Sequence, residues 1–521
     1  MLTALKLENF KGIGVPVRIP LRPITLMFGA NSSGKSTIIQ AIHYAREILQ
    51  NRNADVDRTS LGGDSIDLGG FRSLIYNHDL DRSIVLRFDL DLTELDLPQN
   101  SYAAMALVGE EPPDISSHVQ SAWIELTITY SRILDFPILK ISTIGINDEP
   151  FARLTSAIDQ KSFTWEYNAA HSLWDLQLDE PLLWRADLPD HESVLWAELI
   201  IGPSNQPSAA TTALPLWDDV PLVIQASELE PQWEPAAWVP VSNFVLLFSQ
   251  LVTGPTKILL SILNRFRYLG PIRNVPHRNF QPAITPDESR WADGTAAWDA
   301  LFRQVDDTLL IELHYWMSDE RLKTGYNIVL VEYREVPTHN QLYSALLSDT
   351  LLDDIENVAE TFKKLPVRKR LRIADNEKFL EVEPPDIGVG ISQVVPVLAI
   401  ALDTQNGIVA IEQPELHLHP AMQAELGDLF IESALGPRSN MFLVETHSEH
   451  LILRLLRRIR ETSEDSLPNA EMKLTPSDVQ VIYVRQDKDS VRIYPLEITP
   501  DGEFADKWPD GFFAERAKEL F

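Results

Sequence analysis

The N-terminal residues alternate between apolar and polar positions in three short runs. LTALKLENF, PVRIPL and ITLMFGA are each predicted to form a strand, because successive side chains of a strand point to opposite faces. Over residues 35–50 the apolar side chains then recur at helical spacing. The pattern therefore predicts a strand, a glycine-rich turn and a helix in direct succession.

The rest of the chain divides into a β-rich part and a mixed part. Runs such as SIVLRFDLDL and AWIELTITYS predict mostly strands and loops between about 60 and 240. Beyond them we expect helices at 241–268, 295–317, 342–365, 397–403, 421–434 and 448–462, and strands in NIVLVEY, GIVAIE and NMFLVE. The sequence contains no internal repeat and no heptad array, so no long coiled coil is expected.

Composition narrows the classes of protein that fit. The 521 residues are too many for one hydrophobic core, and a net charge of −31 repels nucleic acids and anionic membranes unless a basic patch or a partner intervenes. The lack of cysteine excludes disulfides and thiolate metal sites and fits a cytoplasmic protein, and no signal peptide is expected. The apolar stretch 241–263 contains Lys257 and a Gly254-Pro255 break, so it is predicted to be buried or amphipathic rather than membrane-spanning.

The turn after the third strand, GANSSGKST at 29–37, matches the pattern of a phosphate-binding loop. Its glycines let the backbone curl so that N–H groups face phosphate oxygens, and the helix start adds its positive end. Lys35 is expected to reach the β- and γ-phosphates, and the Ser36 hydroxyl to bind Mg²⁺. The residues expected to bind the nucleotide are Gly29, Asn31, Ser32, Ser33, Gly34, Lys35, Ser36 and Thr37.

The other half of the site is expected in VAIEQPELHLHP, residues 409–420. An apolar strand ends there at Glu412, whose carboxylate can hold Mg²⁺ if the strand lies beside the phosphate loop. Gln413 follows, and its carboxamide cannot take a proton from water. Glu415, two residues further on, is a carboxylate that could replace it.

Two more segments place polar groups at the ends of predicted elements. NMFLVETHSEH carries His447 just after an apolar strand, where it can sense the γ-phosphate or orient the attacking water. In DIGVGISQ, Gly388, Gly390 and Ser392 precede a helix whose N–H groups make a second anion site. Because the chain already has one phosphate loop, this second site is expected to close over the nucleotide of a neighbouring subunit.

Together these segments resemble the ATPase heads of the ABC/SMC/RecF superfamily. LENFKGI is similar to the start of SMC- and RecF-like heads, GANSSGKST to Walker A, GVGISQ to a divergent signature motif, and VAIEQPELHLHP to Walker B. VETHSEHL resembles the switch-histidine segment of the OLD-like branch (overcoming-lysogenization-defect proteins). The likeness is greatest to stand-alone prokaryotic ATPases with a DxGxGxSQ signature, an IEQPExHLHP Walker B and a C-terminal domain of unknown function with a W-P-x-G-F-F tail, here 508–513.

The resemblance implies that ATP and Mg²⁺ bind between two subunits arranged head to head, with Gly390 and Ser392 acting in trans. It places Glu412 at the Mg²⁺-binding acid and Gln413 at the usual catalytic glutamate. Loss of a general base costs ~10²–10⁴-fold in rate, so slow hydrolysis and a long-lived ATP-bound dimer are expected, with Glu415 or His447 sharing the catalysis. The loop that usually completes the Mg²⁺ shell has no match, because 68–79 lacks glutamine.

The expected fold is α/β: a P-loop head of the ABC/SMC type with a mixed sheet, a β-rich insertion containing tryptophans and a small C-terminal α+β extension. VQVIYVRQDKDS, with Asp487 and Asp489, is interpreted as a surface hairpin. The predicted divisions are an N-terminal lobe with Walker A at 1–90, the insertion at 91–265, a helical or mixed middle region at 266–384, a C-terminal lobe with signature, Walker B and switch histidine at 385–462, and the extension at 463–521.

Three functions stay open for such an ATPase. The first is a DNA-linked process of prokaryotic defence or genome maintenance, with KKLPVRKRLR (363–372) and RLLRRIR (454–460) either contacting DNA or forming a solvated helix face or an acid-pairing surface. The second is a nucleotide-gated scaffold that clamps an effector protein, such as a nuclease encoded nearby, which the acidic charge favours. The third is a transporter subunit, which the missing LSGGQ signature and the SMC-like start disfavour.

Overall fold

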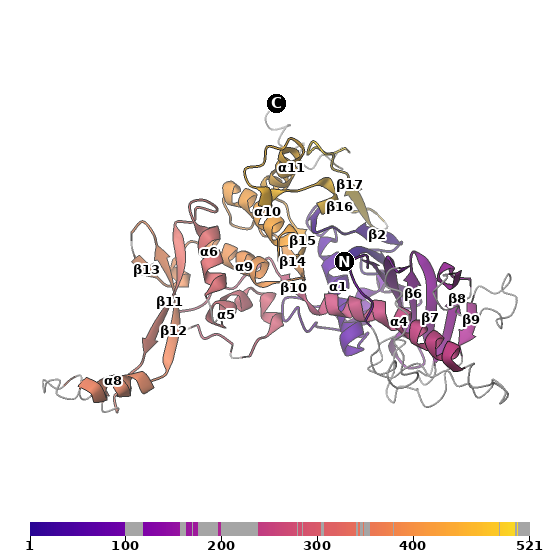
Figure 1. Ribbon diagram of the computed structural model, residues 1–521, viewed down its shortest axis with the longest axis horizontal. Helices are drawn as coiled ribbons and strands as arrows, with labels where there is room; N and C mark the ends of the chain where they lie inside the picture. The colour runs from indigo at the N-terminus through magenta and orange to yellow at the C-terminus, as the bar shows by residue number, and fades with distance from the viewer. Residues whose placement is uncertain are drawn as a thin grey trace.

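The computed structural model is organised around three β-sheets, with a central sheet between an eight-stranded sheet and a projecting arm (Figure 1). The residues described are 1–98, 118–156, 163–168, 170–175, 196–199, 238–278, 280–283, 285–303, 307–339, 342–343, 347, 355–378, 380–488, 490–505 and 508.

The central sheet has six strands in the order β10-β14-β15-β3-β16-β17. All neighbours are parallel except β16 and β17, which are antiparallel. Strands from distant parts of the chain therefore end at one edge, where β3 leads into helix α1. The strands are β10 (Phe266–Leu269), β14 (Ile408–Glu412), β15 (Met441–Glu445), β3 (Ile24–Phe28), β16 (Val479–Gln486) and β17 (Val491–Leu496), and the helix is α1 (Lys35–Asn51).

Both faces of the central sheet are covered, which explains why its strands are almost continuously apolar. Along β14, Ala410 belongs to the core shared with α1 and the eight-stranded sheet, and Ile411 to the core on the opposite face. The opposite core is closed by α5 (Thr295–Arg303), α6 (Thr308–Met317), α9 (Val389–Asp403), α10 (Pro420–Leu435) and α11 (Glu449–Ser463).

The eight-stranded sheet is antiparallel, in the order β2-β1-β4-β5-β6-β7-β8-β9. Because β4 pairs with β5 along its whole length, this sheet runs across the predicted division at residue 90, and the divisions themselves stay predictions. Helix α4 (Trp238–Asn264) packs against α1 and against β4, β5 and β6. The strands are β1 (Leu2–Glu8), β2 (Val17–Pro20), β4 (Ser83–Asp91), β5 (Ser121–Ser131), β6 (Phe136–Ile146), β7 (Glu149–Ser156), β8 (Phe163–Asn168) and β9 (Trp196–Leu199).

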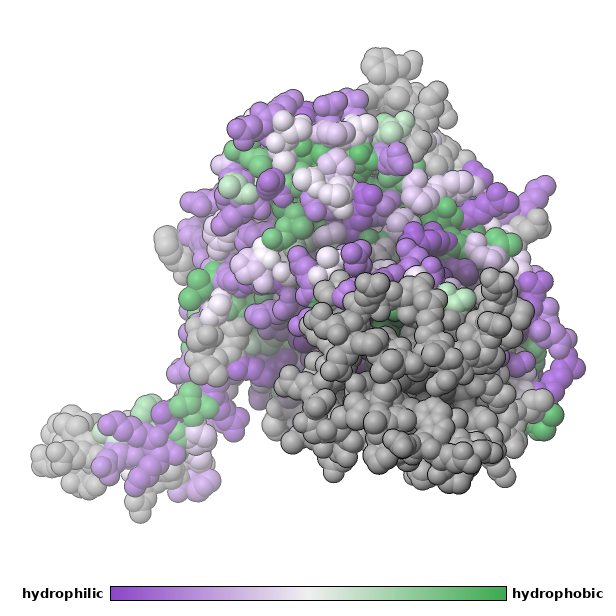
Figure 2. Space-filling view, turned by 45° about the vertical axis from the view of Figure 1, so that its right-hand side comes forward, coloured by the Kyte–Doolittle hydropathy of each residue, from purple (hydrophilic) through white to green (hydrophobic). Residues whose placement is uncertain are grey.

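The projecting arm is a three-stranded sheet that carries a helix at its far end (Figure 1). It consists of β11 (Tyr326–Arg334), β12 (Val367–Asp375), β13 (Leu380–Val382) and α8 (Ile355–Lys364). Hydrophilic residues cover most of its described surface in Figure 2. Shorter helices are α2 (Gly70–Leu74) and the 3-10 turns Tyr76–His78, Ser172–Asp175, Glu288–Trp291, Pro384–Asp386, Ala470–Met472 and Pro476–Asp478.

The expected α/β P-loop fold with a mixed sheet is confirmed, and the described residues contain no long coiled coil. Within the same residues, every helix is too short or too polar to cross a membrane. Of the W-P-x-G-F-F tail, only Trp508 lies within the described residues, where its ring packs edge-on against Phe28 of β3.

Two local expectations are wrong, and a third is wrong in part. The helix predicted over 295–317 is two helices, because Asp307 has a φ of 55°, which an α-helix does not accommodate. The cluster 363–372 is not a helix face, since from Val367 onward it forms β12. The hairpin predicted at 479–490 is present, since β16 pairs antiparallel with β17, but its first strand is not at the surface, because Val479–Val484 is buried beside β3 in the central sheet. The nearly continuous apolar run VQVIYV is what a strand covered on both faces requires.

Candidate functional site

The loop between β3 and α1 is held close to the C-terminal hairpin by two glycines with positive φ. Gly29 has a φ of 150° and Gly34 one of 100°. A Cβ atom on Gly29 would lie 2.2 Å from the carbonyl oxygen of Val484, and one on Gly34 would lie 3.0 Å from a methyl carbon of Val491. Only glycine therefore lets the loop sit directly on β16 and β17.

The polar residues of this loop differ in exposure. Asn31 and Ser32 are exposed, whereas Ser33 and Thr37 are buried. Among the described residues, the Ser33 hydroxyl has no hydrogen-bond partner, an arrangement that costs about 1–3 kcal/mol when a polar atom is buried. The start of α1 likewise has no side-chain cap. Unsatisfied donors around a curled backbone fit a loop that binds phosphate.

Lys35 and Ser36 both contact Glu445, the last residue of β15. The Ser36 hydroxyl donates to Glu445 Oε2 at 2.8 Å, and Lys35 Nζ lies 3.5 Å from Glu445 Oε1. Lys35 is only 3% exposed and also donates to the carbonyl oxygens of Gly29 and Ala30. Glu445 is a site residue that the motifs did not identify, although NMFLVE ends in an acid just as GIVAIE does.

Glu412 ends β14 and stands opposite Glu445 in the register of the two parallel strands. Tyr268 of β10, a second residue that the motifs missed, donates its hydroxyl to Glu412 Oε1 at 3.1 Å. Burial and the nearby Glu445 raise the pKa of Glu412 to about 7, while Tyr268, Ser36 and Lys35 oppose the rise. Two adjacent carboxylates and a hydroxyl are hard oxygen donors, and this set fits Mg²⁺.

Gln413 leaves β14 in a left-handed backbone conformation, with a φ of 47°. Its N–H donates to the carbonyl oxygen of Glu445 at 2.7 Å. Glu415 accepts hydrogen bonds from the Thr446 hydroxyl at 2.8 Å and from the His447 N–H at 2.7 Å, and burial raises its pKa. The Glu415 carboxylate therefore fastens this loop to the end of β15, and its role as a replacement base stays a prediction.

His447 follows β15 at the same edge of the sheet as the phosphate loop. Burial and the positive charge of Lys35 lower its pKa. The imidazole is therefore neutral at pH 7 and able to accept a hydrogen bond, as a group that orients water must be. Its part in catalysis stays a prediction.

Arg273 holds the backbone at the end of β14, where the Walker B loop (residues 412–419) begins. Arg273 lies beyond β10, is 3% exposed, and donates to the carbonyl oxygens of Glu412 and Gln413 at 2.8 and 3.0 Å. Gln393 of α9 donates in turn to the Arg273 carbonyl oxygen at 2.9 Å. Burial lowers the pKa of Arg273 to about 10, so the guanidinium stays charged at neutral pH. Arg273 thus connects α9 with the backbone of Gln413.

The start of α9 packs on the Walker B loop of its own chain. Gly388 is the N-terminal cap residue and provides no side-chain cap, and a Cβ atom on Gly390 would lie 2.8 Å from the carbonyl oxygen of His417. Val389 is 52% exposed, whereas Ser392 is 1% exposed and donates its hydroxyl to the Val389 carbonyl oxygen. The first turn of α9 therefore reaches the surface, and the trans contacts of Gly390 and Ser392 stay predictions.

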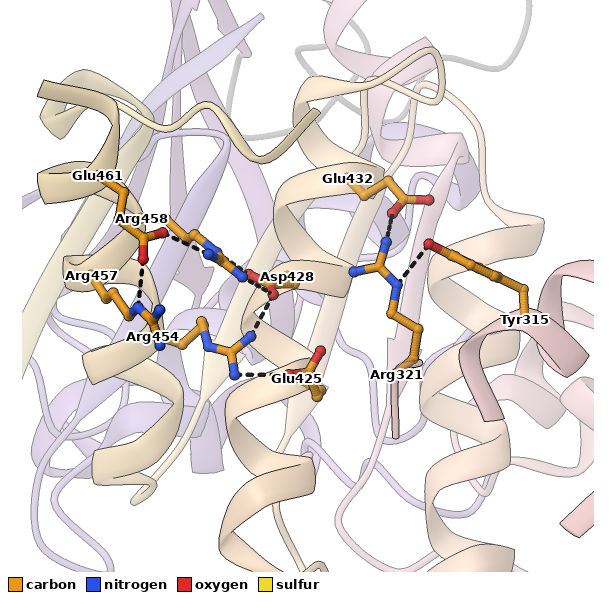
Figure 3. Close-up of polar contacts among 9 residues, drawn as sticks. All are labelled: Tyr315, Arg321, Glu425, Asp428, Glu432, Arg454, Arg457, Arg458 and Glu461. Atoms are coloured by element: carbon orange, nitrogen blue, oxygen red, sulfur yellow. Dashed lines mark hydrogen bonds and ion pairs between the residues drawn. The ribbon is translucent and has the colours of Figure 1, made fainter. Parts of the chain in front are cut away.

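The basic cluster 454–460 on α11 is largely paired with acids of the same chain (Figure 3). Arg458 donates to both oxygens of Asp428 on α10, at 2.8 and 2.6 Å, and Arg454 contacts the same carboxylate. Asp428 is 1% exposed, and Glu425 and Glu461 complete the network. These arginines hold α11 on α10, which leaves little of their charge for an external phosphate.

On the arm, part of the basic cluster 363–372 is also paired with acidic side chains of the same chain. Its ion pairs are Arg368 with Glu335, Lys369 with Glu332 and Arg372 with Glu383. The cluster on α11 therefore agrees with the acid-pairing interpretation, whereas on the arm the ion pairs involve three of the six basic residues.

Comparison with known families covers both halves of this site. Residues 4–68 match the family model described as "AAA domain", and residues 332–452 match "AAA ATPase domain". Residues 474–521, which include β16 and β17, match "Protein of unknown function (DUF3696)". A search of curated proteins gave no match. Two AAA family models therefore match the two segments that carry the phosphate loop and the strands β14 and β15, and Tyr268 and Arg273 lie outside both.

Among solved structures, the chain is similar to heads of SMC proteins. One is an SmcHead bound to the C-winged helix domain of ScpA, with 11% identity, a TM-score of 0.39, and coverage of 95% of this chain and 98% of that one. Another is the SMC head domain from Thermotoga maritima, with 9% identity, a TM-score of 0.36, and coverage of 95% and 99%. These superpositions are loose, and the assignment of the fold rests on the sheet order and the phosphate loop.

Proposed function

We propose that the protein is a slow, Mg²⁺-dependent ATPase whose ATP-bound, head-to-head dimer is long-lived. The observation that carries the proposal is Gln413, which takes the place of the usual catalytic glutamate at the end of β14. Its backbone is fixed by Glu445 and by Arg273. A carboxamide held there can position water by hydrogen bonding but cannot remove its proton, so the expected rate is reduced by ~10²–10⁴-fold.

The exposed start of α9 supports the dimer. Its first turn lacks a side-chain cap, and Val389, the first residue of the helix, is about half exposed. An anion from outside the subunit would satisfy these N–H groups and meet the positive end of the helix. The γ-phosphate of a partner's ATP is such an anion, and its loss on hydrolysis would weaken the dimer. In this proposal ATP is bound by both subunits and links them in the dimer.

Two processes compete for this ATP cycle. A DNA-linked role in defence or genome maintenance is the one that the family resemblance suggests. The cluster on α11 favours instead a nucleotide-gated scaffold that clamps an effector protein, because most of its arginines are paired with acids of the same chain. In both cases the long-lived ATP dimer is the functional state.

The test is ATP turnover with the oligomeric state followed by light scattering in the same samples. We expect the wild-type chain to dimerise with ATP and turn it over slowly, Lys35→Ala to lose ATP binding, and Gln413→Glu to hydrolyse at least about tenfold faster. Fast turnover by the wild type, with no gain in Gln413→Glu, would show that Gln413 does not limit the rate. A chain that stays monomeric with ATP would remove the dimer from the proposal.

A further inference from the structure

The carboxylate of Glu445, at the end of β15, lies beside the phosphate loop. Glu445 Oε2 lies 2.8 Å from the hydroxyl of Ser36, which the loop pattern assigns to Mg²⁺. Glu412, the Walker B acid, is its register neighbour on β14. We propose, on the basis of the ATP site described above, that Glu445 binds the Mg²⁺ of Mg²⁺·ATP directly, together with the hydroxyl of Ser36. Glu412, which accepts a hydrogen bond from Tyr268, binds the same Mg²⁺ through a water molecule.

The spacing of the two oxygens agrees with direct binding. Ligands of Mg²⁺ lie at 2.0–2.1 Å in near-octahedral geometry, so two neighbouring ligands are about 2.9 Å apart. Ser36 Oγ and Glu445 Oε2 are separated by 2.8 Å. The two oxygens are therefore spaced as neighbouring ligands of one Mg²⁺ would be, and a cation would replace their hydrogen bond with little side-chain movement.

The charges around Glu445 change when ATP arrives. The carboxylate is almost buried and now faces the ammonium of Lys35 at 3.5 Å. Lys35 is expected to turn to the phosphates of ATP, which would leave a buried carboxylate facing more negative charge. A divalent cation held by Glu445 removes this conflict. The position therefore makes ATP binding depend strongly on Mg²⁺, and it makes Glu445 repel ATP when Mg²⁺ is absent.

The segment where another Mg²⁺ ligand would be expected does not provide one in place of Glu445. Residues 68–79, where the magnesium-completing glutamine would be expected, contain no glutamine. Nor do the described residues include a group of three or more His, Cys, Asp or Glu side chains able to hold a metal alone. Phosphate oxygens and water must supply the remaining ligands, as is usual for Mg²⁺. The site is thus one that binds the cation together with ATP.

The first experiment measures binding of a fluorescent ATP analogue, in EDTA and in Mg²⁺, by the wild-type chain, Glu445→Gln and the control Glu464→Gln at the exposed end of α11. We expect Mg²⁺ to strengthen binding by the wild type and the control. In Glu445→Gln this gain should fall by about tenfold or more, and binding in EDTA should equal or exceed that of the wild type. A purely structural role would weaken binding equally in both conditions.

A second variant tests direct contact with the metal. The chain has no cysteine, so Glu445→Cys introduces a single thiol. Because thiolates prefer soft cations, Cd²⁺ should restore analogue binding to Glu445→Cys better than Mg²⁺ does, and should not restore it to Glu445→Gln. If the variants do not fold, Mn²⁺·ATP on wild-type chain labelled with ¹³C-glutamate tests for a directly bound carboxylate, since such a carboxylate gives a strong electron–nuclear coupling that an outer one does not. The same measurement on labelled Glu412→Gln shows whether the bound carboxylate is Glu445 or Glu412.

The outcomes separate this proposal from the one it rests on. A full Mg²⁺ gain in Glu445→Gln, no rescue by Cd²⁺, or the lack of a directly bound carboxylate would overturn the role of Glu445 while ATP binding itself persists. Failure of the wild-type chain to bind the analogue in any condition would instead overturn the proposed ATP site.

Discussion

Arg273 offers a way to loosen Gln413 without touching the groups around the phosphates. Arg273→Met keeps an unbranched apolar stem but removes the two hydrogen bonds to the carbonyl oxygens of Glu412 and Gln413. Arg273→Lys keeps the charge and can reach only one of them. The matched control is Arg278→Met in the same segment, since Arg278 is 61% exposed and pairs with Asp386 at the surface. Such an exposed pair contributes about 0–1 kcal/mol.

The expected loss of stability is the difference of two terms of similar size. Leaving the carbonyl oxygen of Glu412 without a donor costs about 1–3 kcal/mol, whereas the carbonyl oxygen of Gln413 still accepts from the Leu416 N–H and loses only about 1 kcal/mol. Against this, burial lowers the pKa of Arg273 from 12.5 to about 10, and removing the cation recovers roughly 3 kcal/mol of that desolvation. The net change in stability for Arg273→Met is therefore within about 1 kcal/mol of zero, which shifts the melting temperature by no more than a few degrees.

Turnover should respond more than stability. Gln413 occupies a left-handed conformation that costs a non-glycine residue about 1–2 kcal/mol, and Arg273 is one of the contacts that impose it. Without the guanidinium this backbone can relax and carry the carboxamide away from the water it positions. A loss of about 1.4 kcal/mol in the transition state is a tenfold fall in rate, so we expect about tenfold for Arg273→Met and less for Arg273→Lys.

The assay compares ATP turnover, binding of the ATP analogue and thermal melting for the three variants. We expect turnover to fall while analogue binding stays within about threefold of the wild type, because the phosphate loop is untouched. The reasoning is refuted if Arg273→Met turns over ATP at the wild-type rate. It is also refuted if binding and turnover fall together with a large loss of stability, which would make Arg273 a general core residue.

Two further predictions concern stability. His43 is fully buried, and burial lowers its pKa to about 3. Between pH 6.5 and pH 3 only the unfolded chain therefore binds a proton at this residue, and the free energy of unfolding should fall by about 1.4 kcal/mol per pH unit as the pH is lowered. Thermal melting of His43→Phe over the same pH range should lack this contribution. Asp428→Asn leaves Arg454 and Arg458 without their shared carboxylate and should lower the free energy of unfolding by about 3–5 kcal/mol, measured by thermal melting. The control Arg457→Ala changes a side chain that is 63% exposed and should lower it by less than about 1 kcal/mol.

The elements that the sequence predicted best are those with local signals. The phosphate loop combines glycines with a lysine between an apolar strand and an amphipathic helix, and all of these lie within residues 24–51. The strands that end at Glu412 and near His447 were likewise visible as apolar runs that stop at polar residues. Such signals depend on neighbouring residues, so one sequence is enough to recognise them.

The residues that the sequence did not assign depend on which distant strands become neighbours. Tyr268 meets Glu412 only because β10 pairs with β14, and Glu445 meets Ser36 only because β15 pairs with β3. The position of β16 also depends on a distant strand: it belongs to the hairpin predicted at the surface, but it pairs with β3 inside the central sheet. No periodicity within these segments specifies their partners, since parallel pairing is decided by the packing of the whole sheet.

The strand order also gives a reason for the carboxamide at position 413. Glu412, Glu415 and Glu445 already bring three carboxylates to this edge, and burial raises the pKa of the first two. A fourth carboxylate at Gln413 would add like charge beside them, and before metal and nucleotide arrive the cations beside this group are Lys35 and Arg273. Gln413→Glu should therefore gain turnover in Mg²⁺ while binding ATP more weakly in EDTA than the wild type. We propose that the carboxamide at position 413 slows hydrolysis and thereby lets the site keep ATP bound.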